Sequence, residues 1–368
     1  MRATTPETTL TPKEAPLLDR GNLTKAIFAA RKRFEHDRAV DPTQYVKLWK
    51  EDDVSEAGPA RALTLILRTR GCTWDYQASC TMCGYFVDVL PKKLTPDDLI
   101  AQWRRAQREI HDEALLKIYT GGNFLDANEV YPAALHEILR SAAPRFRKIT
   151  VETRPEYIRA DVVKPLIDIL APHDCKLELA IGLESSSDEV CDQAINKGYG
   201  FAEFVKGAKT AHESGARVKA YLLLKPPFLT EDEAVEDMVT SVRDAAPHAD
   251  VLSVNPTNVQ NFTLVDRMYR RREYRPPWLW SILEVLQRSK PSAQGRILKS
   301  DPVGGGKNRG AHNCGRCDEK VLPLLERYNA TQDVAFVEAA QAVDCRCKRE
   351  YRAVRDLEGF LGASHFTG

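Results

Sequence analysis

Several features that would place the chain in a special class are missing. It contains no run of 18 or more apolar residues, which excludes a membrane-spanning helix. The first residues, MRATTPETTLTPKEAP, lack the apolar stretch of a secretory signal, so we expect a short disordered tail on a cytoplasmic protein with no membrane partner. Lys and Arg number 53 and Asp and Glu 52, and this net charge of +1 excludes a globally basic nucleic-acid binder. A locally basic face remains possible because steering depends on where charges lie.

Six segments rich in aliphatic and β-branched residues are separated by helical patterns, which predicts parallel βαβ units. Thr95 and Thr230 are expected N-caps of two of these helices. Six units favour an α/β fold, a partial (β/α)6 TIM-like barrel, over a doubly wound sheet, which is the alternative. The expected strands are Ala62–Thr69, Leu115–Thr120, Lys148–Glu152, Lys176–Gly182, Arg217–Leu224 and Asp250–Asn255.

The composition changes after Pro291 to glycine, basic residues and cysteine. We therefore expect three parts. Residues 1–55 are a tail with a helical extension, residues 56–290 form the partial barrel, and residues 291–368 form a small C-terminal metal domain.

Seven of the nine cysteines fall into two tight groups, which in a cytoplasmic protein indicates metal binding rather than disulfides. Cys175 and Cys191 stand apart and are expected to be buried apolar residues. The first group, Cys72, Cys80 and Cys83, directly follows the first expected strand. Three thiolates on one loop leave one iron of a 4Fe–4S cluster open to an outside ligand, which is the requirement for cleaving S-adenosylmethionine. The alternative is a zinc site completed by a distant His or Cys.

Polar motifs follow the next three expected strands. Gly121-Gly122-Asn123 follows the second, Glu152-Thr153-Arg154 the third and Gly182-Leu183-Glu184 the fourth. In a parallel barrel the loops at the C-terminal strand ends carry the chemistry, so we expect these motifs to converge.

The ordered segments TRGCTWDYQASCTMCGYFVD, TGGNFLD, ETRPEYI, IGLESSSDEVCDQAINKG and LLLKPPFLTE resemble the radical S-adenosylmethionine (radical SAM) superfamily. They look most like its Elongator-catalytic-subunit-like branch and, within that, the radical SAM enzymes of archaeosine biosynthesis, the RaSEA family. The resemblance implies that the three cysteines hold the 4Fe–4S cluster. It also implies cofactor contacts from two sets of residues: Gly121, Gly122 and Asn123 at the methionine part, and Glu152, Arg154 and Glu184 at the ribose or carboxylate.

Two departures from the superfamily pattern matter. The first cysteine gap is seven residues rather than three, and Met82 stands where an aromatic residue is common. We expect Tyr85 to supply the adenine-side contact instead.

The resemblance further implies the reaction. A 5′-deoxyadenosyl radical would take hydrogen from a lysine joined to 7-deazaguanine in tRNA, and C–N cleavage would leave archaeosine, which is lyase chemistry. The expected partners are tRNA, the archaeosine synthase that attaches the lysine, and an electron donor. The alternatives are another Elongator-type tRNA-modifying enzyme and a non-catalytic metal-containing RNA-binding protein.

The second cysteine group suits a closed four-thiolate site. Two short knuckles of this kind favour zinc over a second iron–sulfur cluster, and His312 could replace one ligand. The ligands would be Cys314, Cys317, Cys345 and Cys347.

Two runs of basic residues with interspersed aromatics suit phosphate contacts and base stacking. The alternative is that these basic residues form solvent-exposed helix faces with no binding role. The candidate RNA-binding residues are Arg267, Arg270, Arg271, Arg272, Arg275, Lys348 and Arg349.

Overall fold

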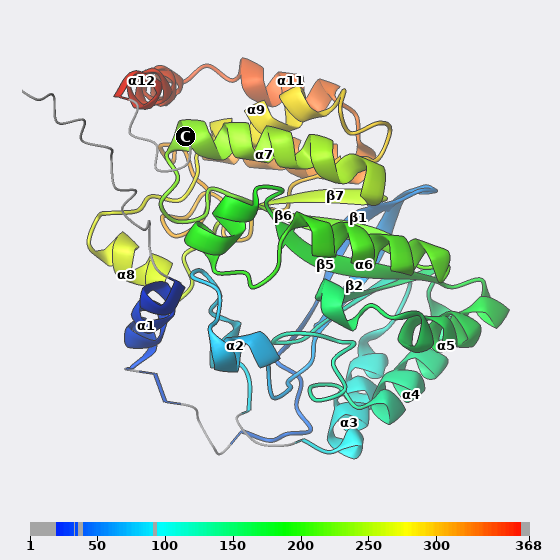
Figure 1. The fold of residues 1–368 in the computed structure, drawn as a ribbon. Helices are drawn as coiled ribbons and strands as arrows, with labels where there is room; N and C mark the ends of the chain where they lie inside the picture. The colour runs from blue at the N-terminus through cyan, green and yellow to red at the C-terminus, as the bar shows by residue number, and fades with distance from the viewer. Residues whose placement is uncertain (1–19, 33, 36–39, 91–93, 362–368) are drawn as a thin grey trace, which may run out of the picture.

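One sheet of eight strands forms the centre of the protein (Figure 1). The computed structural model describes residues 20–32, 34–35, 40–90 and 94–361, so the expected N-terminal tail lies outside the described residues. The strands lie in chain order, the first pair antiparallel and every later pair parallel. They are β1 (Lys47–Ser55), β2 (Gly58–Ile66), β3 (Leu115–Tyr119), β4 (Lys148–Thr153), β5 (Lys176–Glu184), β6 (Arg217–Leu224), β7 (Val251–Pro256) and β8 (Ile297–Lys299).

The sheet is curled into a half-barrel. The hydroxyls of Tyr119 on β3 and Tyr221 on β6 lie 2.7 Å apart although two strands separate them in the sheet. At the two edges, Asp53 of β1 and Lys299 of β8 form an ion pair of 2.5 Å. The predicted partial barrel is therefore confirmed and the doubly wound alternative is wrong. β2 to β7 correspond to the six expected strands, and β1 and β8 are additional.

Helices cover the outer face of the sheet, and residues facing them are apolar. On β4, Ile149 and Val151 are fully buried under this layer, while Thr150 and Glu152 alternate with them on the inner face. The capping boxes of Thr95 and Thr230 are present as expected. The helices here are α3 (Pro96–Ala106), α4 (Pro132–Ala142), α5 (Ala160–Leu170), α6 (Phe201–Glu213), α7 (Glu231–Ala245) and α9 (Leu279–Ser289). Within the described ranges, none of the helices has the length and apolar character needed to span a membrane.

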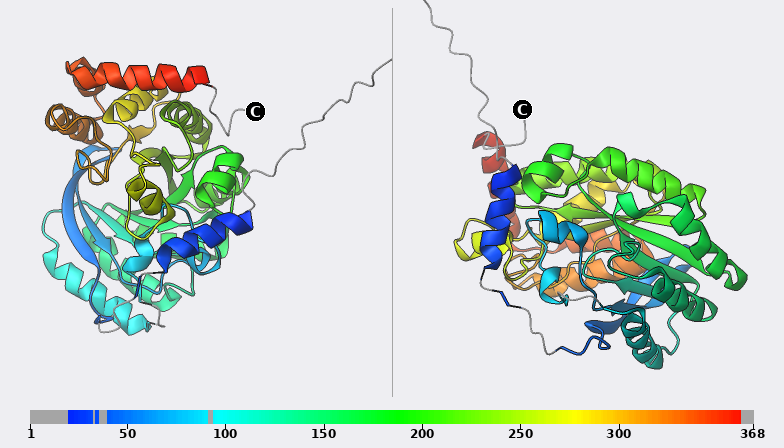
Figure 2. Two further views of the ribbon diagram at one scale, coloured as in Figure 1. Left: turned by 90° about the vertical axis from the view of Figure 1, so that its left-hand side faces the viewer. Right: turned by 60° about the horizontal axis from the view of Figure 1, so that its bottom comes forward.

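The chain after residue 290 packs onto the half-barrel. β8 continues the sheet beyond the expected boundary, and α10 (Asp318–Thr331) lies against β1 and β2 with Val321, Leu325 and Tyr328 in the common core. α11 (Ala335–Ala342) and α12 (Arg346–Leu361) lie over α9 and α7 (Figure 2). The division at 290 stays a prediction.

Three further helices lie near the C-terminal ends of the strands. α1 (Arg20–Arg31) contacts α8 (Leu264–Arg270), with Leu23, Ile27 and Leu264 forming a small apolar cluster. α2 (Thr73–Gln77) lies in the cysteine loop that follows β2. Figure 1 shows the three helices on one side of the molecule.

Candidate active site

The cysteine loop between Cys72 and Cys83 is fixed by a segment that follows β5. Thr81 donates from its backbone N to the carbonyl of Ile195 (3.0 Å) and from its hydroxyl to that of Ala194 (2.8 Å). Asn196 donates to the carbonyl of Ser79 at 2.8 Å. The acceptors of Thr81 lie in a π-helix, η6 (Val190–Ile195), so this turn and Asn196 anchor the loop.

Trp74, inside the cysteine loop, locks the two segments together. Its indole N–H donates to the carbonyl of Asn196 at 2.9 Å. A Cβ on Gly198 would lie only 2.6 Å from the Trp74 ring, so glycine is needed there for the close approach.

The three cysteines of the loop are partly exposed and close enough to influence one another. Burial raises the pKa of Cys72 to about 11, against the effect of Arg154, and neighbouring Cys80 adds to the rise. Burial, followed by Asp75 and Cys80, also raises the pKa of Cys83. Three such thiols on one loop fit a cluster that makes thiolate ligands favourable through its own positive charge.

The Gly121–Asn123 loop lies directly against the cysteine loop. A Cβ on Gly122 would lie 2.4 Å from Cys72 Cα and 2.4 Å from Glu129 Oε2. Asn123 is fully buried, and its Nδ2 lies 3.6 Å from Cys72 Sγ. Its Oδ1 is buried and has no hydrogen-bond partner among the described residues, which leaves an acceptor free for a ligand donor.

Glu152, Arg154 and Glu184 lie at neighbouring strand ends, as expected. Glu152 accepts from the backbone N of Thr120 at 2.6 Å, and burial raises its pKa to about 8. Arg154 is 8% exposed, pairs with Glu156 at 2.5 Å and donates to the carbonyl of Lys197 at 3.1 Å.

Glu184 ends β5 at a register shift and has a φ of +70°. Its Oε1 pairs with Lys197 Nζ at 2.7 Å, and the side chains of both residues are largely buried. Lys197 was missed by the sequence reasoning, although it lies inside the quoted segment IGLESSSDEVCDQAINKG as the Lys of Asn-Lys-Gly. Arg154 and Glu184 are thus engaged in ion pairs, whereas Glu152 accepts a backbone hydrogen bond, and the cofactor contacts of all three stay predictions.

Tyr85 follows Cys83 and is 51% exposed. It begins the short 3-10 helix η1 (Tyr85–Val87), and the preceding Gly84 donates from its backbone N to Gln260 Oε1 at 2.5 Å. The exposed ring is free to contact a ligand, and its predicted adenine contact is untested.

Arg31 at the end of α1 is a second residue that the sequence reasoning missed. Its guanidinium donates to both carboxylate oxygens of Asp75, at 2.9 and 2.8 Å, and to the carbonyl of Cys83 at 3.2 Å. It also stacks on the Phe86 ring with a centroid distance of 3.9 Å. α1 is therefore fastened to the cysteine loop by one side chain. A basic residue at a helix end gives no signal of this contact in the sequence.

The four C-terminal cysteines converge. Three Sγ–Sγ distances are 3.5 Å, between residues 314 and 345, 317 and 347, and 345 and 347. All four sulfurs lie within 4.8 Å of one another. Asn313 and Trp280 each donate an N–H to a sulfur at 3.4 Å, to Cys317 and Cys347 respectively, as residues around metal thiolates do. His312 instead bonds through its ring to the carbonyl of Gly310.

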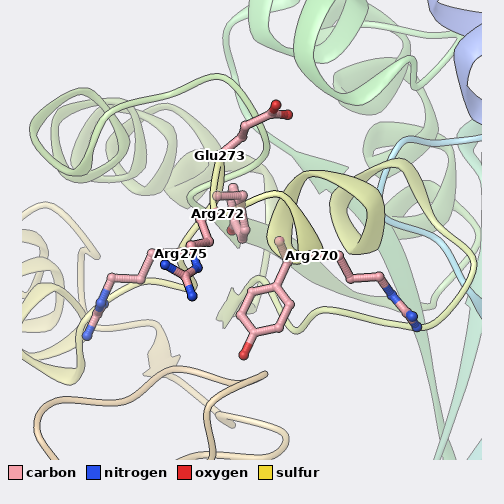
Figure 3. A pocket seen from close by; sticks show the side chains of 6 residues that line it. Arg270, Arg272, Glu273 and Arg275 are labelled. Carbon is pink, nitrogen blue, oxygen red and sulfur yellow. The ribbon is translucent and has the colours of Figure 1, made fainter.

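Arg270, Arg272 and Arg275 of the run after β7 line an open hollow of about 640 Å³ together with Glu273 (Figure 3). Arg267 and Arg271 lie outside its lining. Arg267, Arg271 and Arg272 are exposed, and Arg270 is exposed while pairing with Asp266 at 3.0 Å. Arg275 is engaged: it donates to the carbonyl of His312 at 2.8 Å and stacks on Trp278.

The second basic run is less uniform. Arg349 is exposed on α12, whereas Lys348 donates to the carbonyl of Gln341 and lies 5.3 Å from the Trp280 ring centroid. RNA binding by either run stays a prediction.

The helix α8, which leads into this hollow (the arginine hollow), contacts the cysteine loop. Leu264, the first residue of α8, donates from its backbone N to the carbonyl of Thr81 at 3.1 Å. Tyr274, in the lining of the hollow, donates its hydroxyl to the carbonyl of Lys225 just after β6, at 2.6 Å. Both contacts place the basic surface at the end of the half-barrel that carries the cysteines.

Comparison with known proteins shows which sequences and structures this chain resembles. The Radical SAM superfamily model matches residues 66–240. Archaeosine synthase subunit beta of Methanosarcina acetivorans is 41% identical over 346 residues, 92% of this chain and 97% of the relative. The protein of that name from Thermococcus kodakarensis is 38% identical over 82% of this chain and 95% of the relative. The structure of Elp3 from Methanocaldococcus infernus, lacking residues 1–46, is 14% identical, with a TM-score of 0.47 over 74% of this chain and 64% of that one.

Proposed function

The chain belongs to the radical SAM superfamily and, within it, to the family of archaeosine synthase subunit beta, and from this we propose that it is the radical enzyme that converts lysine-modified 7-deazaguanine in tRNA to archaeosine. The family's cofactors are a 4Fe–4S cluster and S-adenosylmethionine.

One observation carries the proposal. The cysteine loop and the Gly121–Asn123 loop are packed so closely that only glycine fits at 122, and Asn123 Oδ1 is left buried without a partner beside Cys72. A buried unsatisfied acceptor costs stability unless a ligand donor reaches it. The amino group of S-adenosylmethionine is such a donor.

The residues present therefore fit the cofactors. Cys72, Cys80 and Cys83 would hold three irons, and Asn123 with the backbone of Gly121 and Gly122 would hold the amino-acid end. Reductive cleavage of the bound S-adenosylmethionine supplies a 5′-deoxyadenosyl radical. The chain's part is to orient the reactants and to exclude water. The close packing of the cysteine loop and the Gly121–Asn123 loop contributes to both tasks.

We assign the arginine hollow to tRNA. It follows α8, whose first residues bond to Thr81 of the cysteine loop, and its lining includes exposed arginines and Tyr269. Guanidinium groups suit phosphate, and aromatic rings suit unpaired bases. Hydrogen abstraction from the lysine carbon next to the amidine nitrogen would precede C–N cleavage. The name of the relatives implies a second subunit, and we propose that it is the lysine-attaching enzyme, with a separate electron donor.

We assign the C-terminal cysteines to zinc. Four thiolates around one zinc at about 2.3 Å lie about 3.8 Å apart. Four of the Sγ–Sγ distances are 3.5 to 3.9 Å and all lie within 4.8 Å, which suits one ion better than a cluster of four irons. Metal analysis of anaerobically reconstituted protein should give about four irons and one zinc. About eight irons and no zinc would contradict the assignment.

The cysteine assignment is tested by replacing Cys72, Cys80 or Cys83 singly with Ala. Each variant should produce no 5′-deoxyadenosine under reducing anaerobic conditions, because the site has no spare thiolate. Cys175→Ala, a buried cysteine of neither group, is the matched control and should keep activity. Full activity in any single loop variant would refute the assignment. Absence of cleavage by the wild type, with metal and tRNA bound, would favour a non-catalytic RNA-binding protein.

A further inference from the structure

The inner face of the half-barrel is lined by charged side chains rather than by the apolar layers of a filled barrel. Lys117 pairs with Asp53 at 2.5 Å and with Glu51 at 2.6 Å. Lys148 pairs with Glu178 at 2.9 Å, and Lys299 with Asp53 at 2.5 Å. These three buried lysines are thus neutralised by carboxylates of other strands.

Lys219 on β6 is the exception. It is 3% exposed, yet among the described residues its ammonium takes part in no hydrogen bond and no ion pair. The ring of Tyr221 makes a cation–π contact with it, with the ring centroid 4.8 Å from Nζ. A buried cation with no hydrogen-bond acceptor among the described residues is expensive, because only the charges of Asp53 and Glu178, neither within ion-pair distance, offset its lost hydration.

Burial and the neighbouring charges both act on the pKa of Lys219. Burial, together with the neighbouring cations Lys299 and Lys117, lowers the pKa of Lys219 to about 8, while Asp53 and Glu178 act in the opposite direction. At pH 7 the folded protein therefore holds an ammonium that would be more stable in the unfolded chain.

The register places Lys219 beside the candidate active site. Glu152 pairs with Ala180, and Ala180 pairs with Lys219, so the three share one row across β4, β5 and β6. Two strand spacings separate Glu152 and Lys219 by about 10 Å. Both alternate onto the inner face, where Ala180, the residue between them in the row, contributes only a methyl group.

We propose that Lys219 binds the α-carboxylate of the lysine carried by the modified base. This inference rests on the proposed function, in which lysine is joined through its side-chain nitrogen and keeps its carboxylate free. An ammonium with three donors and no partner matches one carboxylate, and the row beside Glu152 lies within the reach of an extended lysine. Lys219 would thus be a specificity residue that selects an amino acid over a simple amine.

The test removes the charge from each partner in turn. Lys219→Met and wild type are compared on tRNA bearing the lysine adduct and on tRNA bearing the 1,5-diaminopentane adduct, which lacks the carboxylate. Wild type should prefer the lysine adduct roughly tenfold to a hundredfold in kcat/KM, the range of a charge-assisted hydrogen bond. Lys219→Met should lose this preference, and Lys219→Arg should keep part of it. Lys206→Met, on an exposed face of α6, is the matched control and should behave as wild type.

Two further measurements separate a binding role from a structural one. The Tm of Lys219→Met at pH 7 should equal or exceed that of wild type, because an unpaired buried charge has been removed. The number of 5′-deoxyadenosines formed per archaeosine should rise, because a poorly held substrate uncouples the reaction.

Three outcomes would overturn the inference: an unchanged preference in Lys219→Met, a large fall in its Tm, or a raised KM for S-adenosylmethionine alone, which would assign the ammonium to the cofactor's carboxylate. If wild type converts neither adduct, the proposed function itself has failed. If wild type instead converts both adducts equally, the proposed function stands and the inference about Lys219 has failed.

Discussion

Replacing Gly122 with Ala should disrupt the cluster site although none of the three cysteine ligands is replaced. The added Cβ would lie 2.4 Å from Cys72 Cα, 2.6 Å from Cys72 N and 2.4 Å from Glu129 Oε2. Ordinary carbon contacts begin at about 3.5 Å, so the backbone of Cys72 must move by about 1 Å. Metal sites tolerate about 0.2 Å in their ligand distances, so a shift of this size removes Cys72 from the cluster.

The assay is iron content and absorbance near 400 nm after anaerobic reconstitution. Gly122→Ala should bind less than half of the wild-type iron and lose cofactor cleavage, with an overpacking cost of about 1–3 kcal/mol in stability. Gly295→Ala is the matched control: its φ of +77° strains an alanine by about 1–2 kcal/mol, but nothing lies within 4 Å of its Cβ, so iron should be unchanged. Wild-type iron and cleavage in Gly122→Ala would refute the reasoning.

Three further predictions follow from the site. Glu152→Gln should raise the Tm of the metal-free protein more at pH 8.5 than at pH 5. The reason is that the fold raises the pKa of Glu152 to about 8, so its ionisation above pH 4.5 costs stability. A Tm difference that does not depend on pH would contradict this, and Glu213→Gln is the exposed control. Arg31→Gln should speed the loss of cluster absorbance under a chelator several-fold, because its four hydrogen bonds to the cysteine loop disappear. Lys25→Gln on the same helix should not. Equal rates of absorbance loss in Arg31→Gln and wild type would contradict a stabilising role of Arg31. Replacing Arg270, Arg271 and Arg272 together with Ala should weaken tRNA binding and lower the slope of log affinity against log salt by about 2–3. The same change at Arg104 and Arg105 of α3 and at Arg108 just after it should not. Equal affinities of the Arg270–Arg272 variant and the wild type would remove tRNA from the arginine hollow.

The strands that the sequence predicted are those whose apolar residues run consecutively, and the structure matches Arg217–Leu224 residue for residue. β1 escaped detection because its inner face carries Glu51 and Asp53, which read as a polar loop until their lysine partners on β3 and β8 are known. β8 has only three residues, too few for a pattern.

The site shows the same division. The cysteines and the strand-end motifs could be predicted because each motif is a short continuous segment and the order of the motifs along the chain is informative. Lys197, Arg31 and Lys219 could not, because their significance depends on partners, or on the lack of one, that only folding reveals. Lys219 in particular lies in a strand of ordinary appearance, RVKAYLLL.

The central claim is radical cleavage of the lysine adduct, and one labelling experiment tests it most directly. The tRNA adduct would carry deuterium on the lysine side-chain carbon next to the amidine nitrogen, and both products would be analysed by mass spectrometry after anaerobic reaction with S-adenosylmethionine and a reductant. The account predicts deuterium in 5′-deoxyadenosine together with archaeosine in the tRNA. An intact lysine adduct despite 5′-deoxyadenosine formation, or archaeosine formed with no deuterium transferred, would contradict it.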